Sequence, residues 1–369
     1  YGTVMGAGYP PNRVSGFYRL MEAPWTLVIV APGNKILAPI LRFGWYFLLF
    51  GSMFVVIVLV LIRWGTGQTV TSIKTISRAA EKVAGGDYKQ HLPVNTADEV
   101  GELTRSFNAM LSQLQERMRL KRAMDLAMEV QQNLLPQQAL NVNGVDIYGK
   151  SLYCDETGGD YYDFIYFPEM GPNRIGIAVG DVVGHGVAAA LIMSSVRAFL
   201  RSAVLEKTAL SGVADHVNRL LCNDTAGTGN FMTLFFLELD TECRELRWVR
   251  AGHDPAMVYD SETESFQYLK GEGLALGVDA NWRYEEYRFT EIAGSTVILI
   301  GTDGLWETEN ERGEKFGRDR LRAVLKQNSQ RSSQKIVETV LAAINSFRGD
   351  ARQADDLTLV VVRNLACSR

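Results

Sequence analysis

The sequence lacks the features that mark several common classes of protein. No stretch has the basic density of a nucleic-acid groove, and the formal net charge is only -4, so we expect no nucleic-acid partner. The chain starts at Tyr1 without the pattern of a signal peptide, and it looks like a fragment of something longer. Its few cysteines lie far apart without CxxC spacing, which excludes a zinc knuckle or disulfide framework and suggests reduced thiols in the cytosol: Cys154, Cys222, Cys243 and Cys367.

A long hydrophobic run stands near the N-terminus. Residues 43–62 carry no charge and have the length of a helix that spans a bilayer. A buried core helix is the alternative, but Trp45 and Trp64 at the two ends favour the membrane. More basic residues follow the run closely than precede it, so the positive-inside rule favours a cytoplasmic C-terminal side at the inner membrane.

Residues 1–42 precede this predicted transmembrane helix. Within them, residues 23–40 form an apolar, strand-like run that is interrupted by prolines. This run resembles the closing strand and exit of an extracytoplasmic Cache-type sensor domain. A short periplasmic loop is an equally good interpretation.

Two amphipathic helices are predicted after the membrane run. The glycines of Gly85-Gly86-Asp87 end the first helix, and the acidic Asp98-Glu99 begins the second. Residues 63–116 therefore resemble a HAMP signalling module, whose helices pair across a dimer, although the proline usual near its first helix is absent. The first helix has one apolar stripe: Val70, Ile73, Ile76, Ala80 and Val83.

A helical linker is predicted over residues 117–136, where Pro136 ends it. Its apolar positions do not continue the register of the second HAMP helix, and such a phase change alters coiled-coil winding. A solvated spacer is the alternative, but an apolar seam favours a homodimer through the HAMP module and linker. The seam comprises Leu120, Met124, Ala127, Gln131 and Leu134.

The remaining segment, residues 140–365, alternates short β-rich runs with helical patterns. The runs are joined by turn-like segments that suit antiparallel pairing. We therefore predict an α+β fold, a β-sandwich with helices outside. The predicted strands are 175–179, 231–239, 245–251, 296–300 and 357–362, and the predicted helices are 187–205, 210–221, 318–326 and 332–347.

Four acidic motifs stand at the ends of these elements. They are Gly158-Gly159-Asp160, Gly180-Asp181-Val182, Thr302-Asp303-Gly304 and Asp355-Asp356-Leu357. The second and third follow apolar strands directly, which fixes a carboxylate at a strand end while glycine allows close backbone approach. Carboxylates without histidine-rich or cysteine-rich partners suit a hard cation held by oxygen, Mg²⁺ or Mn²⁺.

In this order the motifs resemble those of metal-dependent (PPM-type) protein phosphatases, and their surroundings resemble the bacterial SpoIIE-like branch. The supporting segments are residues 127–136 (AMEVQQNLLP), 229–233 (GNFMT) and 251–255 (AGHDP). The resemblance covers about the last 240 residues. It implies a phosphatase domain of αββα architecture that hydrolyses phosphoserine or phosphothreonine on a protein, plausibly an anti-sigma-factor antagonist of the STAS type.

The resemblance also assigns roles to the acidic residues. Asp181 would bridge two divalent cations, and the Val182 carbonyl would complete one coordination shell. Asp160 and Asp303 would hold the metals from opposite sides, and Asp355 would close the second site. A water activated by both metals would then attack phosphorus, with no protein nucleophile.

Other residues and other functions fit these motifs less well. Asp163 and Asp356 suit turns or supporting positions better than metal ligation, His185 suits a helix entry at least as well as an acid for the leaving group, and His253 suits a structural position. The GGDEF signature of diguanylate cyclases shares Gly158-Gly159-Asp160 but not the residues that follow. The linker helix has no histidine for a histidine kinase. A catalytically inactive PPM-like binding module remains the main alternative.

Overall fold

The computed structural model describes residues 1–9, 11–142, 144–155, 157–166, 173–206, 209–242, 244–290, 292 and 294–364. Cys243 and Cys367 lie outside the described residues. The chain divides into two compact units between Met118 and Arg119.

The first unit begins with a three-stranded antiparallel sheet of β1 (Gly2–Met5), β2 (Arg13–Arg19) and β3 (Thr26–Pro32). Helix α1 (Gly33–Ala84) follows directly and includes the whole apolar run, whose side chains are exposed. Its length and apolar composition suffice to cross a membrane. The strand-like prediction was wrong beyond Pro32, because residues 33–40 form the first turns of α1. The helix accommodates Pro39 in its interior, although proline has no N–H to donate there.

The end of α1 and the start of α2 (Glu99–Leu134) pack around a small core of Ala79, Leu92, Phe107 and Leu111. The Asn108 side chain accepts from the Leu92 N–H at 3.1 Å and donates to its carbonyl at 2.8 Å, which fixes the connector between the helices. Gly86, with φ of 93°, makes the left-handed turn after α1.

The second unit contains two antiparallel sheets. The strand order of one sheet is β11-β10-β13-β14-β5-β4, and that of the other is β12-β9-β8-β7-β6. The strands are β4 (Leu140–Val142), β5 (Val145–Leu152), β6 (Tyr161–Ile165), β7 (Arg174–Val182), β8 (Met232–Asp240), β9 (Glu245–Ala251), β10 (Ala256–Asp260), β11 (Ser265–Leu269), β12 (Tyr287–Phe289), β13 (Thr296–Gly301) and β14 (Leu357–Asn364).

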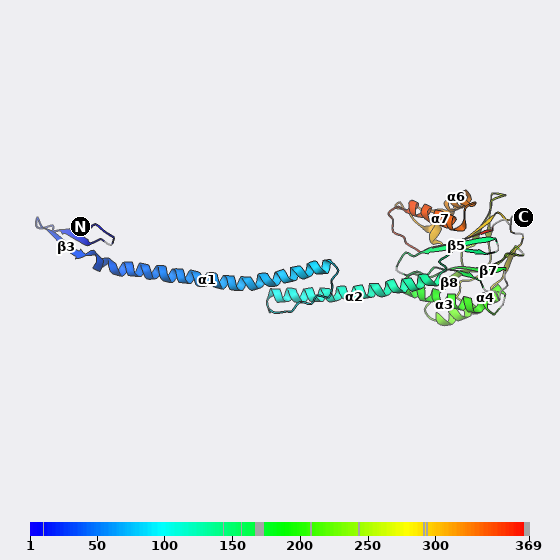
Figure 1. The fold of residues 1–369 in the computed structure, drawn as a ribbon, viewed down its shortest axis with the longest axis horizontal. Helices are drawn as coiled ribbons and strands as arrows, with labels where there is room; N and C mark the ends of the chain where they lie inside the picture. Colours follow the sequence, from blue (N-terminus) through cyan, green and yellow to red (C-terminus); the bar gives the residue numbers. More distant parts are fainter. Residues whose placement is uncertain are drawn as a thin grey trace. The chain divides into compact units, whose positions relative to one another are not determined.

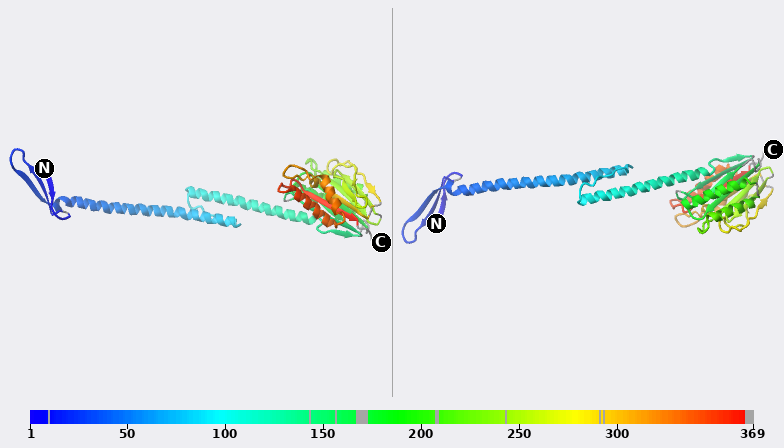
Figure 2. Two further views of the ribbon diagram at one scale, coloured as in Figure 1. Left: turned by 90° about the horizontal axis from the view of Figure 1, so that it is seen from above. Right: turned by 90° about the horizontal axis from the view of Figure 1, so that it is seen from below.

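Helices cover the outer face of each sheet, which confirms the predicted sandwich with helices outside (Figure 1). Helices α3 (Val187–Val204) and α4 (Leu210–Asp224) lie on the β7–β8 side, and α6 (Gly317–Asn328) and α7 (Ser333–Arg348) lie on the β5 side. Figure 2 shows these helix pairs on opposite faces when the sandwich is viewed from above and from below. A short helix, α5 (Gly304–Glu307), follows β13.

Strand β14 shows why the sequence of a central strand of this sandwich is apolar at nearly every position. Val360 and Val362 belong to the core between the sheets, whereas Leu357, Leu359 and Val361 belong to the core under α6 and α7. Successive side chains of a strand point to opposite faces, so a strand covered on both faces must be apolar at every position.

Candidate active site

Asp160 and Asp181 lie at the same end of two neighbouring strands. The antiparallel register pairs Tyr161 of β6 with Gly180 of β7. Asp160 precedes Tyr161 and Asp181 follows Gly180, so the two aspartates lie beside each other. A Cβ on Gly159 would lie 2.9 Å from the Val182 carbonyl oxygen. Glycine is therefore needed for the chain before Asp160 to pass close to the backbone after Asp181.

Asp303 and Asp355 come from the other sheet. Asp303 follows β13 and stands at the start of α5, and Asp355 lies two residues before β14. A Cβ on Gly304 would lie 2.1 Å from the Asp356 carbonyl oxygen, so the two loops touch only because residue 304 is glycine. The Thr302 hydroxyl donates to Asp160 at 2.9 Å and joins the two sheets at this edge.

The carboxylates are close enough to repel one another. Burial and the charge of Asp181 raise the pKa of Asp160 well above its usual value. Burial and the charges of Asp303 and Asp355 raise the pKa of Asp181 to about 7. The pKa of Asp303 is raised by loss of water contact and by Asp355. Mutual repulsion of this kind disfavours the ionised forms until a cation enters.

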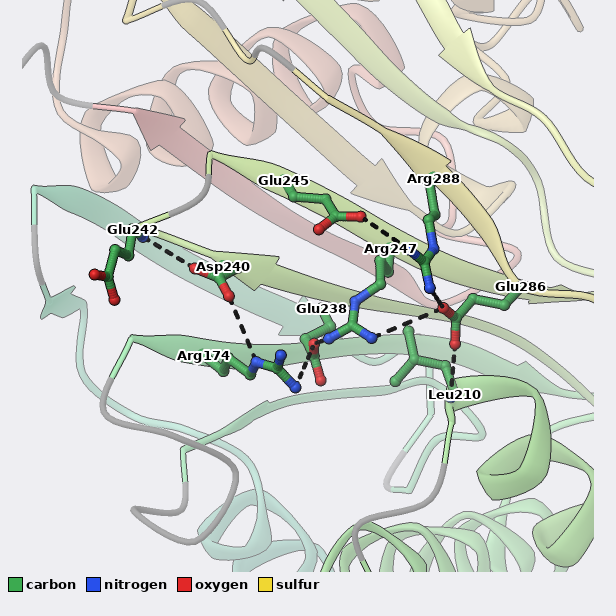
Figure 3. A network of polar contacts seen from close by, with 9 residues as sticks. All are labelled: Arg174, Leu210, Glu238, Asp240, Glu242, Glu245, Arg247, Glu286 and Arg288. Carbon is green, nitrogen blue, oxygen red and sulfur yellow. Dashed lines mark hydrogen bonds and ion pairs between the residues drawn. The ribbon is translucent and has the colours of Figure 1, made fainter.

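Other acidic side chains of the sheet that contains β7 and β8 are paired with arginines. In Figure 3, Glu238 lies between Arg247 and Arg174, at 3.8 Å from the latter, and Arg174 also approaches Asp240 at 3.5 Å. Near the candidate site, the ion pairs of the described residues involve other acids instead: Asp155, Asp163, Asp254 and Glu307. The aspartates at the strand ends therefore take part in no ion pair within the described part of the chain.

This donor set fits divalent cations of the Mg²⁺ or Mn²⁺ kind, because all of its ligands are oxygens. Across the described residues, however, no three acidic, histidine or cysteine side chains gather closely enough to hold one ion. Mg²⁺ is commonly bound by one or two carboxylates while water fills its other positions. The aspartates fit that sparse mode of binding, with Asp160 buried and both Asp303 and Asp355 exposed.

Asp356 and Asp163 occupy different positions. Asp356 is buried and accepts from the Cys154 N–H at 2.8 Å and the Gly159 N–H at 3.1 Å, so it fixes the loop before Asp160. Asp163 is fully buried and forms a bidentate ion pair with Arg201 of α3, at 2.6 and 2.7 Å. That pair ties β6 to the covering helix.

The two histidines of the motifs, His185 and His253, lie in different environments. His185 is exposed, and its Nδ1 lies 2.7 Å from a carboxylate oxygen of Asp155. His253 is buried, with Nδ1 2.8 Å from the Thr233 hydroxyl, and burial lowers its pKa to about 4. It is therefore neutral near pH 7 and supports the strand end beside Asp181.

The structure corrects the place of Gln131. The sequence pattern put it in an apolar seam facing a second copy, but it is buried within the second unit. Its side chain donates to the Gly158 carbonyl at 2.6 Å and accepts from the Gly158 N–H at 3.4 Å. The last turn of α2 therefore holds the backbone two residues before Asp160. Only a polar residue in the otherwise apolar repeat hinted at this.

Family models match most of the chain outside the N-terminal segment. The model for stage II sporulation protein E (SpoIIE) matches residues 171–364, and the HAMP domain model matches residues 64–116.

Two curated relatives share this region. Phosphoserine phosphatase RsbU of Bacillus subtilis is 28% identical over 246 residues, which cover 66% of this chain and 70% of RsbU. Protein IcfG of Synechocystis is 25% identical over 338 residues, which cover 80% of this chain and 51% of IcfG. The match thus spans only about half of IcfG.

Solved structures share the fold of the second unit. The SiaA-PP2C domain of Pseudomonas aeruginosa aligns with a TM-score of 0.59 at 22% identity, covering 67% of this chain and 98% of that domain. The PP2C phosphatase domain of SpoIIE from Bacillus subtilis, with a fragment of its regulatory domain, aligns at 0.51 with 16% identity, covering 59% and 63%.

Proposed function

This chain belongs to the SpoIIE family, with a PP2C-type protein phosphatase domain and a HAMP domain, and we propose that it is a membrane-anchored, signal-regulated receptor phosphatase. Its substrate is phosphoserine or phosphothreonine on a protein, a proposal supported by the relative named phosphoserine phosphatase RsbU. A STAS-type antagonist of an anti-sigma factor is the proposed protein substrate.

The observation that carries the proposal is the group of aspartates at one edge of the sandwich, none of which forms an ion pair with another described residue. We propose that Asp181 would hold both of two divalent cations, Mn²⁺ or Mg²⁺, and that the Val182 carbonyl would be a further ligand. Asp160, Asp303 and Asp355 supply the remaining protein ligands. Such cations, when bound, lower the pKa of water and neutralise phosphoryl oxygens.

The chain's own contribution is to hold these ligands in place. Asp160 is fixed by the Thr302 hydroxyl, and its loop is fixed by Asp356 and Gln131. Asp303 and Asp355 remain at the exposed side, where a phosphorylated segment of another protein can approach. Catalytic groups held at fixed spacing lose little entropy on reaction.

The first test is metal-dependent hydrolysis by the purified cytoplasmic part. We expect hydrolysis of a phosphoserine protein only with Mn²⁺ or Mg²⁺. Asp181→Asn or Asp303→Asn should lower the rate roughly hundredfold or more, because each removes a charged ligand. Circular dichroism should show that both variants remain folded.

Full activity in excess chelator, or in either variant, would contradict the metal assignment. Metal binding without hydrolysis of any phosphoprotein would instead favour the catalytically inactive signalling module. Phosphorylated STAS domains encoded in the same genome are the substrates to assay first.

The membrane and dimer assignments are part of the same proposal. Residues 43–62 would span the inner membrane with the phosphatase on the cytoplasmic side. Apolar side chains of the HAMP region, such as Ile73 and Leu103, are about half exposed in the single chain, and pairing with a second copy would bury them. Reporter fusions at both ends of α1 test the topology.

A further inference from the structure

Arg352 lies in the loop between α7 and β14, beside the carboxylate site. It lines a cavity of about 380 Å³ together with Asp355, Gly304 and Glu307. The cavity therefore adjoins the site at Asp355, one of its two exposed aspartates, and at Gly304, the residue after the other.

The loop that carries Arg352 is held on both sides. The side-chain amide of Gln353 donates to the Leu152 carbonyl at 2.9 Å and to the Asp355 carbonyl at 2.8 Å. Arg348 donates to the Gln353 side-chain oxygen at 3.1 Å. These bonds fix the backbone next to Arg352 relative to Asp355.

Asp155 orients the guanidinium of Arg352. Its carboxylate lies 3.3 Å from Nη2 of Arg352 and 2.7 Å from Nδ1 of His185. The neighbouring Cys154 N–H donates to Asp356 at 2.8 Å, so Asp155 stands on a segment tied to the site. The arginine is thus directed by a carboxylate outside the proposed metal ligands.

Arg352 retains hydrogen-bonding capacity. Its side chain is 86% exposed, and within the described residues only Nη2 has a hydrogen-bond partner. The other cation that lines the cavity, Lys315, is paired with Glu307 at 3.1 Å. A planar guanidinium can keep one bond to Asp155 and offer its remaining N–H groups to phosphate oxygens.

We propose that Arg352 binds the phosphoryl oxygens of the substrate, with Asp155 as its positioning residue. The inference rests on the proposed phosphatase function and adds to it a protein contact for the phosphate. Positive charge from the protein at the outer side of this acidic site favours the approach of a phosphate dianion. Arg352 supplies that charge where the cavity meets Asp355.

The test compares Arg352→Ala, Arg352→Lys, Asp155→Asn and the control Lys315→Ala in the cytoplasmic part with Mg²⁺. Binding of inorganic phosphate is measured by calorimetry, and KM and kcat are measured with p-nitrophenyl phosphate and with a phosphoserine protein. Arg352→Ala should raise the Kd for phosphate and both KM values on the order of tenfold to hundredfold. Arg352→Lys should recover part of this loss, and Asp155→Asn should cost several-fold.

Lys315→Ala removes one positive charge from the same cavity and should change phosphate binding less than about twofold. An equal loss in Lys315→Ala and Arg352→Ala, or unchanged phosphate binding in Arg352→Ala, would overturn the proposal. A KM change confined to the protein substrate would make Arg352 a docking residue and also overturn it. Phosphate binding does not need turnover, so it decides the inference even if the wild-type protein hydrolyses nothing, which would refute the proposed function alone.

Discussion

His253 is a buried, neutral side chain whose cost of ionisation enters the stability of the fold. Its folded pKa of about 4 lies below the ordinary value of 6.5, because burial disfavours the charged ring. A lowered pKa gives stability that is present above about pH 6.5 and is lost as the pH falls through about 4.

We expect the wild type to lose on the order of 3 kcal/mol more than His253→Gln between pH 7.5 and pH 4. Urea unfolding at several pH values measures the difference, and the acidic residues that titrate in both proteins cancel in the comparison. Parallel stability curves for the two proteins would contradict a buried neutral histidine.

Residues differ in how far the sequence predicts their place. The sequence places Asp181 and Asp303 at the ends of apolar strands, but only the resemblance to phosphatases implied that they meet at one edge. Asp155 and Arg352 could not be found in this way, because their contact joins loop positions 197 residues apart. Gln131 was misplaced, since helical spacing alone does not show whether a position faces a second copy or the chain's own loop.

Elements were predictable where one physical signal dominated. Strands β7, β8, β9, β13 and β14 and helices α3, α4, α6 and α7 are confirmed, because each has a long apolar run or stripe. Strand β5 was missed, since Gly149 interrupts its pattern. A Cβ there would lie 2.6 Å from the Tyr162 ring, so packing requires a glycine that local propensity disfavours in a strand.

Helix α2 is the element through which the HAMP region could influence catalysis. Its last turn holds Gly158 through Gln131, and Leu120, Met124 and Val130 on it are exposed. A helix rotates about 100° per residue, so insertions after Leu114 turn the HAMP side relative to this contact.

We expect phosphatase rate to vary across insertions of one to four residues after Leu114. Four residues restore the phase to within about 40°, so that variant should be closer to wild type than the two-residue insertion. Rates and oligomeric state are measured together. Equal rates across the series, or a monomer as active as the dimer, would leave α2 a passive tether.

At the scale of the whole molecule, the chain order joins an apolar helix, a HAMP module and a phosphatase domain. Composition and periodicity predicted the apolar helix and the amphipathic helices after it, and resemblance of the motifs identified the HAMP module and the phosphatase domain. Contacts between loops distant in sequence were beyond those signals, because they depend on how two sheets pack.

The proposed metal ligands are divided between the two sheets, with Asp160 and Asp181 on one and Asp303 and Asp355 on the other. A bound cation would thus cross-link the sheets, and the melting temperature would report on metal occupancy. At a hundred times Kd, we expect a gain of about 2.7 kcal/mol in unfolding free energy, read by calorimetry. Asp160→Asn and Asp355→Asn each cut the link from one side, so each should abolish most of the gain. If either variant kept the full gain, the metal would be held by one sheet alone.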